Sequence, residues 1–211
     1  RGYRLETAKA PLRENLAAGI ILLSGWSGSK AFVDPFCGSG TFPIEAAMIA
    51  QNIPPGIHRD FAFFQWPIHQ KDLWQDQLQL ARQGILPNGS PIAGFDRDRG
   101  AIEAARSNAA RAGLLDRITF TQQAISYLEP PAPEGWIITN PPYGVRVSEN
   151  KDLRDLYARF GSILLHRFPS WSLAVLTTDD LLVSALGLGE PKQKIHLVNG
   201  GIPVQLSLFP H

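Results

Sequence analysis

Four consecutive residues in the second half of the chain combine a side-chain amide, two prolines and an aromatic ring: Asn140, Pro141, Pro142 and Tyr143. The apolar residues before them predict a buried strand, which must end here because proline cannot donate a hydrogen bond to a sheet. The amide oxygen of Asn140 and the carbonyl of Pro141 then become two acceptors at the carboxyl end of a strand. In open α/β sheets, ligands bind at that end.

Two acceptors of this kind suit an exocyclic amino group on a nucleobase. Such a nitrogen is a poor nucleophile, because its lone pair is delocalised into the ring. If Asn140 and Pro141 each accept one amino hydrogen, the lone pair points out of the ring plane and the developing positive charge is stabilised. Tyr143 can stack on the base. A Pro-Pro turn that only closes a strand fits these four residues equally well, so the rest of the chain must decide.

A glycine-rich turn in the first half of the chain is the second candidate site. Residues 31–33 predict a short buried strand before it, and Ile44 to Ile49 predict an apolar helix after it. A strand, a glycine turn and a helix together allow backbone N–H groups to meet a ligand at the helix N-terminus. A tight turn without a ligand is the alternative. The turn consists of Asp34, Pro35, Phe36, Cys37, Gly38, Ser39, Gly40 and Thr41.

The residues around the glycines favour one cofactor over another. Pro43 stands where a dinucleotide fingerprint has its third glycine. Asp34 would repel a pyrophosphate but suits a ligand that carries an ammonium group. The turn therefore favours S-adenosylmethionine, whose amino-acid end is cationic at nitrogen, over a nicotinamide cofactor. Cys37 is interpreted as a small buried filler rather than a nucleophile, because no histidine lies near it in the sequence.

A second strand is predicted over Ile92 to Asp96, followed by a helix from Asp98 to Ala112. An acidic residue at the tip of this strand is placed to accept both hydroxyls of a ribose. Asp96 could instead cap the helix, but Asp98 can fill that role, so the ribose interpretation is preferred. Arg97 is expected to flank an adenine.

Residues 53–90 do not fit a minimal strand-helix-strand unit and predict an insertion. Asp72 to Gln83 have helical periodicity. The aromatic residues near Arg59 and His69 could stack bases, but aromatics that cap a sheet edge are the preferred explanation. These aromatics are Phe61, Phe63, Phe64 and Trp66.

Length and composition bound the remaining possibilities. The chain has 211 residues, of which 44% are apolar, and this predicts one α/β domain. The single cysteine fits a reducing compartment, so we expect a cytoplasmic protein, and no apolar run reaches the length of a membrane span. The net charge of +1 gives no strong electrostatic footprint for nucleic acid. The first residue is Arg1, which suggests a domain of a longer protein.

The last part of the chain predicts how the sheet ends. Trp171 to Thr177 predict a strand, and Asn199-Gly200-Gly201 between Lys194–Val198 and Pro203–Leu208 give the strongest hairpin signal of the sequence. An antiparallel pair that closes an otherwise parallel sheet departs from plain dinucleotide-binding folds. The histidines show no metal-binding spacing, so no metal site is expected.

Three motifs occur in the order of a known family. Residues 34–41, Gly94-Phe95-Asp96 and residues 140–144 resemble the class I S-adenosylmethionine-dependent methyltransferases that modify exocyclic amines. The chain is more narrowly similar to the methyltransferase domain of the THUMP-containing RNA guanine-N2 methyltransferases, in particular the ribosomal large-subunit enzymes. Gln51-Asn52-Ile53-Pro54-Pro55-Gly56 and Asp72-Leu73-Trp74 extend this similarity through the insertion.

The resemblance implies a Rossmann-like α/β fold with a seven-stranded, mostly parallel sheet, an antiparallel C-terminal strand and helices on both faces. It implies that residues 34–40 hold the methionine end of the cofactor, Asp96 the ribose, and Asn140 to Tyr143 the target base. Many relatives have an aspartate after the third strand that binds the adenine amino group. Here Gln122-Gln123-Ala124 stands instead, so Gln123 or the backbone near Ala124 is expected to make this contact. The RNA-binding THUMP domain of the family would lie upstream.

The sequence thus predicts methyl transfer from S-adenosylmethionine to N2 of a guanine in ribosomal RNA. An adenine-N6 methyltransferase acting on RNA or DNA would use the same four residues. A module that binds cofactor and RNA for assembly, without catalysis, is the alternative from another class. A nicotinamide oxidoreductase is disfavoured by Asp34 and Pro43.

Overall fold

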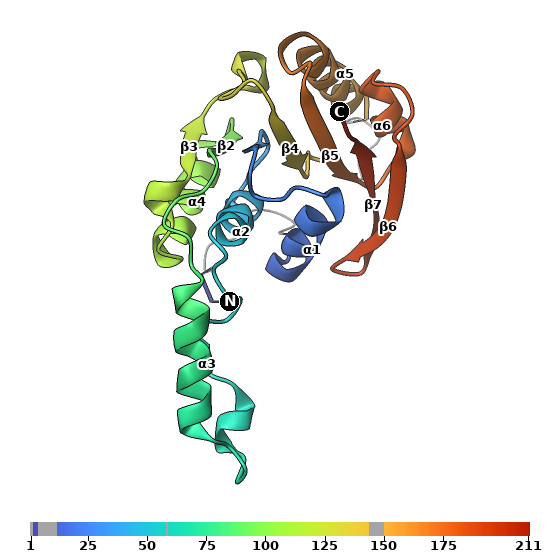
Figure 1. Ribbon diagram of the computed structural model, residues 1–211. Helices are drawn as coiled ribbons and strands as arrows, with labels where there is room; N and C mark the ends of the chain where they lie inside the picture. The colour runs from blue at the N-terminus through green and yellow to red at the C-terminus, as the bar shows by residue number, and fades with distance from the viewer. Residues whose placement is uncertain (1, 4–11, 58, 144–149) are drawn as a thin grey trace.

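A seven-stranded sheet forms the centre of the computed structural model, which describes residues 2–3, 12–57, 59–143 and 150–211 (Figure 1). The strand order is β3-β2-β1-β4-β5-β7-β6, and β7 is antiparallel to both of its neighbours. The mostly parallel sheet with one reversed strand confirms the prediction. The strands are β1 (Ala31–Asp34), β2 (Ile92–Asp96), β3 (Thr119–Gln122), β4 (Gly135–Thr139), β5 (Trp171–Thr177), β6 (Gln193–Asn199) and β7 (Ile202–Phe209).

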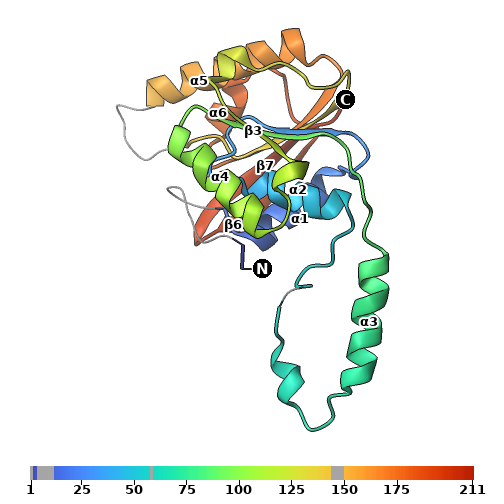
Figure 2. The ribbon, with the colours of Figure 1, turned by 90° about the vertical axis from the view of Figure 1, so that its left-hand side faces the viewer.

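Helices cover both faces of the sheet, as Figures 1 and 2 show. One face packs against α1 (Glu14–Ser24), α2 (Thr41–Ala50) and α4 (Arg99–Arg111), and the other against α5 (Asn150–Arg167) and α6 (Asp180–Ala185). Successive side chains of a strand point to opposite faces. The three central strands therefore supply both layers of the core, with Phe32, Ile138 and Ala174 in the first and Val33, Ile137 and Val175 in the second.

The predicted hairpin at the end of the chain is present between β6 and β7. Gly200 and Gly201 have φ angles of 59° and 87°, in the left-handed region that glycine adopts without a steric cost. The register pairs Thr177 with Gln205. The turn of the hairpin therefore projects beyond the carboxyl end of β5.

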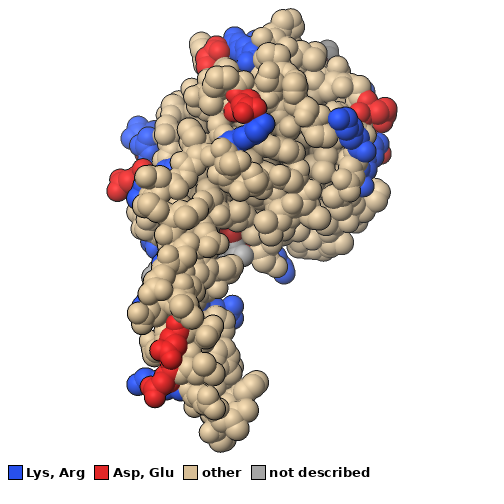
Figure 3. Space-filling model, viewed as in Figure 1, with Lys and Arg blue, Asp and Glu red and all other residues tan. Residues whose placement is uncertain are grey.

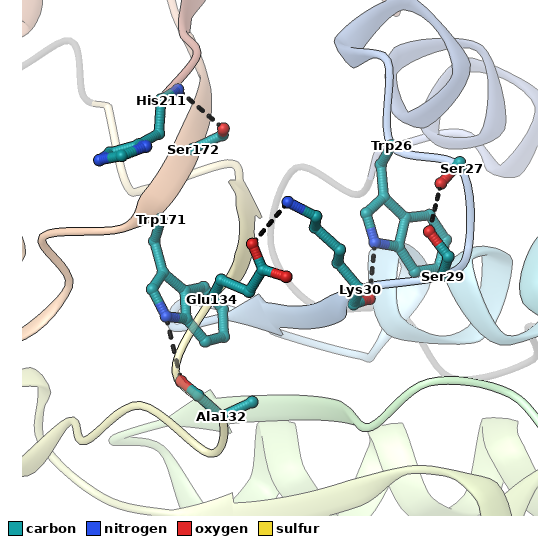
Figure 4. Close-up of polar contacts among 9 residues, drawn as sticks. All are labelled: Trp26, Ser27, Ser29, Lys30, Ala132, Glu134, Trp171, Ser172 and His211. Atoms are coloured by element: carbon teal, nitrogen blue, oxygen red, sulfur yellow. Dashed lines mark hydrogen bonds and ion pairs between the residues drawn. The ribbon is translucent and has the colours of Figure 1, made fainter.

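The amino ends of the strands are held by contacts between loops (Figure 4). The Lys30 ammonium lies 2.6 Å from the Glu134 carboxylate, which joins the segments before β1 and β4. Both side chains are about half exposed, so this pair contributes at most about 1 kcal/mol. The indole N–H of Trp171 donates to the Ala132 carbonyl at 3.2 Å. A cavity of about 360 Å³ opens beside Trp171 and Phe209.

Residues 53–90, which the sequence predicts as an insertion, contain an arm that extends away from the sheet (Figures 1 and 2). It contains the short helix η1 (Ala62–Gln65) and helix α3 (Lys71–Gln83), in which no residue is buried. The prediction that its aromatic residues cap a sheet edge is wrong. The rings pack on each other within the arm instead. Trp74 of α3 contacts three phenylalanines in and beside η1, with ring centroids 5.4 to 5.6 Å apart: Phe61, Phe63 and Phe64.

The charged side chains form no large patch of one sign on the face seen in Figure 3, where basic and acidic residues are interspersed among uncharged ones. This distribution agrees with the net charge of +1. Within the described part of the chain, no helix combines the length and the apolar character needed to cross a membrane.

Gly161 in α5 lies against the backbone of Leu186, the residue that follows α6, and gives a test of this contact. A Cβ atom there would lie 1.7 Å from the Leu186 carbonyl oxygen, so Gly161→Ala should lower the free energy of unfolding by about 1–3 kcal/mol. Gly19 in α1 is a matched control, because a Cβ at that position meets nothing within 4 Å. Gly19→Ala should raise stability by about 0.5–1 kcal/mol. Equal effects of the two substitutions in denaturant titrations would contradict the α5–α6 contact.

Candidate functional site

The candidate residues from distant parts of the sequence meet along one edge of the sheet. Strands β3, β2, β1 and β4 are neighbours and parallel, so their carboxyl ends lie side by side. Asp34 and Asp96 end β1 and β2, and Gln123 and Asn140 follow β3 and β4 directly. The strand order reverses between β1 and β4, and such a switch point opens a crevice for a ligand.

The glycine turn has the backbone geometry of a tight connection between a strand and a helix. Gly38 and Gly40 have φ angles of 51° and 84°, and the Gly40 N–H donates to the Cys37 carbonyl at 2.8 Å. A Cβ on Gly40 would lie 3.0 Å from the Cβ of Ala105 in α4. Gly40 is therefore required both for its left-handed conformation and for the close packing of α4.

Asp34 is buried beneath this turn, with 2% of its surface exposed. Its Oδ1 accepts hydrogen bonds from the Thr139 hydroxyl at 2.6 Å and from the Phe36 N–H at 3.2 Å. Burial raises the pKa of Asp34 to about 7, although both hydrogen bonds oppose the rise. The carboxyl group is therefore close to half-ionised at neutral pH, and a nearby cation would favour its charged form.

Asp96 links the second strand to the glycine turn. Its Oδ2 accepts from the Gly38 N–H at 3.0 Å, and its Oδ1 accepts from the Asp98 N–H at 2.9 Å. Asp98, and not Asp96, caps helix α4 by accepting from Gly100 and Ala101. This confirms the prediction that Asp98 caps the helix, and it leaves the half-buried Asp96 carboxylate at the edge of the sheet, where its contact with a ribose stays a prediction.

The residues expected near an adenine lie beside Asp96. The Gln123 N–H donates to the Asp96 carbonyl at 2.9 Å, which places the start of the loop after β3 against the end of β2. Arg97 and Ala124 are exposed. The side chain of Gln122 bonds to the Arg97 carbonyl at 3.2 Å.

Cys37 is buried in the core beneath the turn. Burial raises the pKa of its thiol well above the ordinary value, and the nearby Asp34 and Asp96 add to the rise. The thiol therefore stays neutral. This confirms the interpretation of Cys37 as a buried filler.

Asn140 carries an unusual oxygen. Its Oδ1 is buried and has no hydrogen-bond partner among the residues that the structure describes. A buried acceptor without a partner costs about 1–3 kcal/mol, so this oxygen needs a partner such as a ligand or a bound water. Pro141 beside it is buried, Pro142 is exposed, and the half-buried ring of Tyr143 packs against both core layers.

Two further residues of this region were not found from the sequence. Thr139 holds Asp34, but the two are 105 positions apart and no local pattern connects them. Glu45 is 1% exposed and accepts from the Tyr3 hydroxyl at 2.8 Å. The sequence does contain a signal for Glu45, because it is the one charged residue in the otherwise mostly apolar helix α2.

The raised pKa of Asp34 gives a pH-dependent prediction. The pKa is about 7 in the folded protein and 3.8 ordinarily, so between these values the folded protein holds a proton that the unfolded chain has released. The stability that this proton provides is complete below about pH 4 and is lost as the pH rises through 7. Between pH 4 and pH 7, the free energy of unfolding of the wild type should fall by on the order of 4 kcal/mol more than that of Asp34→Asn.

Chemical denaturation from pH 4 to pH 8 measures this difference. Asp98→Asn, which changes an exposed carboxylate nearby, should keep the pH dependence of the wild type. Parallel curves for the wild type and Asp34→Asn would contradict a raised pKa.

Comparisons with known proteins agree with this arrangement. The family model described as "RMKL-like, methyltransferase domain" matches residues 1–207. A ribosomal RNA large subunit methyltransferase K/L of Shewanella sp. (strain W3-18-1) is 40% identical over 215 residues, which cover 99% of this chain and 30% of that protein. The chain thus spans less than a third of this relative.

Two solved structures are similar over 99% of this chain. The protein SMU.472, crystallised with SAH, has a TM-score of 0.91 and 40% identity, and 54% of its chain is covered. A Listeria monocytogenes protein, described as "a predicted N6-adenine-specific DNA methylase", has a TM-score of 0.86 and 36% identity, and 53% of it is covered. From the family match over nearly the whole sequence, we conclude that this chain belongs to the RMKL-like methyltransferase domains.

Proposed function

We propose that this domain transfers a methyl group from S-adenosylmethionine to the exocyclic N2 of a guanine in large-subunit ribosomal RNA. The observation that carries the proposal is the buried Asn140 Oδ1, which lacks a partner among the described residues and lies at the switch point of the sheet. An unpaired acceptor at this place matches a ligand that brings its own donor, as an amino group does.

The residues at the strand ends fit S-adenosylmethionine, which supplies an activated methyl group on its sulfonium. Residues 34–41 take the methionine end, and the Asp34 carboxylate, with a pKa near 7, is poised to ionise beside an ammonium group. Asp96 takes the ribose hydroxyls with the lone pairs that remain on its two oxygens. Arg97, Gln123 and Ala124 flank the adenine. That SMU.472 was crystallised with SAH supports this assignment.

Asn140 and Pro141 orient the amine for attack. The amide oxygen of Asn140 and the carbonyl of Pro141 each accept one amino hydrogen, so the lone pair faces the methyl group and the growing positive charge is stabilised. The target base must leave its stack, at a cost of a few kcal/mol, and stacking on Tyr143 offsets part of that cost. Pro142 fixes the backbone between these groups.

The substrate assignment draws on the relatives. The Shewanella protein named as a ribosomal RNA methyltransferase supports an RNA substrate. This domain has a net charge of +1, which is small for a protein that must neutralise phosphates. We therefore assign most of the RNA affinity to an upstream RNA-binding domain of a longer protein. We also propose that this protein acts in the cytoplasm.

Adenine N6 in RNA or DNA is the second candidate target. The similarity to the Listeria protein favours it, and the same four residues would serve an adenine amino group. Mass spectrometry of nucleosides from RNA methylated by the full-length protein separates the two. N2-methylguanosine supports the proposal, whereas N6-methyladenosine would replace guanine with adenine as the target.

Asn140→Ala tests the catalytic assignment. Loss of the amide oxygen should lower kcat on the order of 100- to 1000-fold while the affinity for the cofactor stays within about twofold, because the lost interaction acts on the amine. Labelled methyl transfer and calorimetry measure the two quantities. Asn15→Ala, an exposed asparagine in α1, is the control. A parallel loss of cofactor binding and activity would remove Asn140 from the proposed role.

Asp96→Ala tests the cofactor assignment. Loss of hydrogen bonds between a carboxylate and the ribose should weaken cofactor binding by roughly 10- to 100-fold. Asp98→Ala is the matched control: it removes the cap of α4 and about 1 kcal/mol of stability, but should leave the affinity unchanged. Unchanged affinity of Asp96→Ala in calorimetry would exclude Asp96 from the site.

A further inference from the structure

A second polar atom, like Asn140 Oδ1, is buried without a hydrogen-bond partner among the described residues. Within the described residues, the Tyr157 hydroxyl is the only other buried side-chain oxygen or nitrogen without a hydrogen-bond partner. Tyr157 lies in α5 and is 1% exposed. A phenylalanine would fill the same space without burying a hydroxyl, so packing alone does not explain a tyrosine here.

Tyr157 packs beneath the strand ends that carry the candidate site. Its ring belongs to the core layer formed by Val33, Ile137 and Val175, and Tyr143 packs against the same layer. Thr139 pairs with Val175 in the sheet, so Thr177 lies level with the residues just after β4.

Three polar residues lie near the hydroxyl: Tyr143, Thr177 and Asp179. Burial raises the pKa of Tyr157 well above its ordinary value, and the nearby Tyr143 and Asp179 add to the rise. The Asp179 carboxylate caps α6, because its Oδ1 accepts from the Leu181 N–H at 2.8 Å. The Thr177 hydroxyl is close enough to oppose the rise in pKa, but it does not meet hydrogen-bond geometry with Tyr157, and it accepts from the Asp179 N–H at 3.3 Å. Tyr143 remains.

We infer that Tyr157 is a positioning residue of the target-base pocket, whose hydroxyl forms a hydrogen bond with the Tyr143 hydroxyl when the base enters. The inference rests on the proposed function, in which the base stacks on Tyr143. The bond fixes the plane of that ring, and thereby the angle at which the amine meets Asn140 and Pro141. In the free protein the buried Tyr157 hydroxyl has no hydrogen bond and therefore lowers stability. It gains the bond to Tyr143 only in the complex with the base.

A double-mutant cycle tests the inference, with methyl transfer measured on the full-length protein. Tyr157→Phe and Tyr143→Phe each keep the ring and remove one hydroxyl. Each should lower kcat about 3- to 10-fold, the double variant should be no slower than either single variant, and the cofactor affinity should not change. Tyr157→Phe should also leave Tm unchanged or raise it by about 2–4 °C, because an unpaired buried group is removed.

Tyr127→Phe is the matched control, since this tyrosine is 73% exposed and should behave as the wild type. Wild-type kcat in Tyr157→Phe, or independent effects of the two hydroxyls, would overturn the inference. A lower Tm in Tyr157→Phe that Thr177→Val reproduces would assign the hydroxyl to Thr177 and overturn it as well. If the wild type itself transfers no methyl group to RNA, the proposed function fails, and the inference falls with it.

Discussion

The hydrogen bonds of two carboxylates hold the strand ends of the site together. Asp34 at the end of β1 accepts from Thr139 at the end of β4, and Asp96 at the end of β2 accepts from Gly38 in the glycine turn. These contacts connect three neighbouring strands with the turn between β1 and α2. Because Asp34 is almost fully buried, its ionisation is coupled to this arrangement, which explains its pKa near 7. The remaining features of the site depend on this fixed edge.

Satisfied and unsatisfied polar groups divide the edge into two regions. On the side of β1 and β2, the carboxylates have donors within the protein, so this part is formed in advance. On the side of β4, Asn140 Oδ1 and the Tyr157 hydroxyl are buried without partners among the described residues. Native proteins leave few such groups, and each costs stability. We therefore interpret the first region as the preformed cofactor site and the second as the place where the hydrogen bonds of Asn140 and Tyr157 form when the target base enters.

Local sequence signals predicted much of this molecule. The glycine turn and the Asn199-Gly200-Gly201 hairpin depend on backbone conformations that few residue types adopt, and the cap of α4 depends on the side-chain oxygen of Asp98, so the sequence indicates all three directly. The Thr139–Asp34 bond could not be predicted, because it joins residues 105 positions apart. The aromatic residues of the arm were misplaced for a related reason. Composition predicts that rings such as Phe63 and Trp74 are packed, but it does not say that they pack on each other rather than on the sheet.

The central claim is that the cofactor and the target amine meet between the glycine turn and Asn140. A crystal structure of this domain with S-adenosylhomocysteine and a guanine nucleoside tests it most directly. The account predicts that the cofactor sulfur faces Asn140 across the switch point and that the guanine N2 lies within hydrogen-bond distance of Asn140 Oδ1. A cofactor bound away from Gly38 and Gly40, or an Asn140 Oδ1 that takes a protein partner and leaves the base elsewhere, would contradict it.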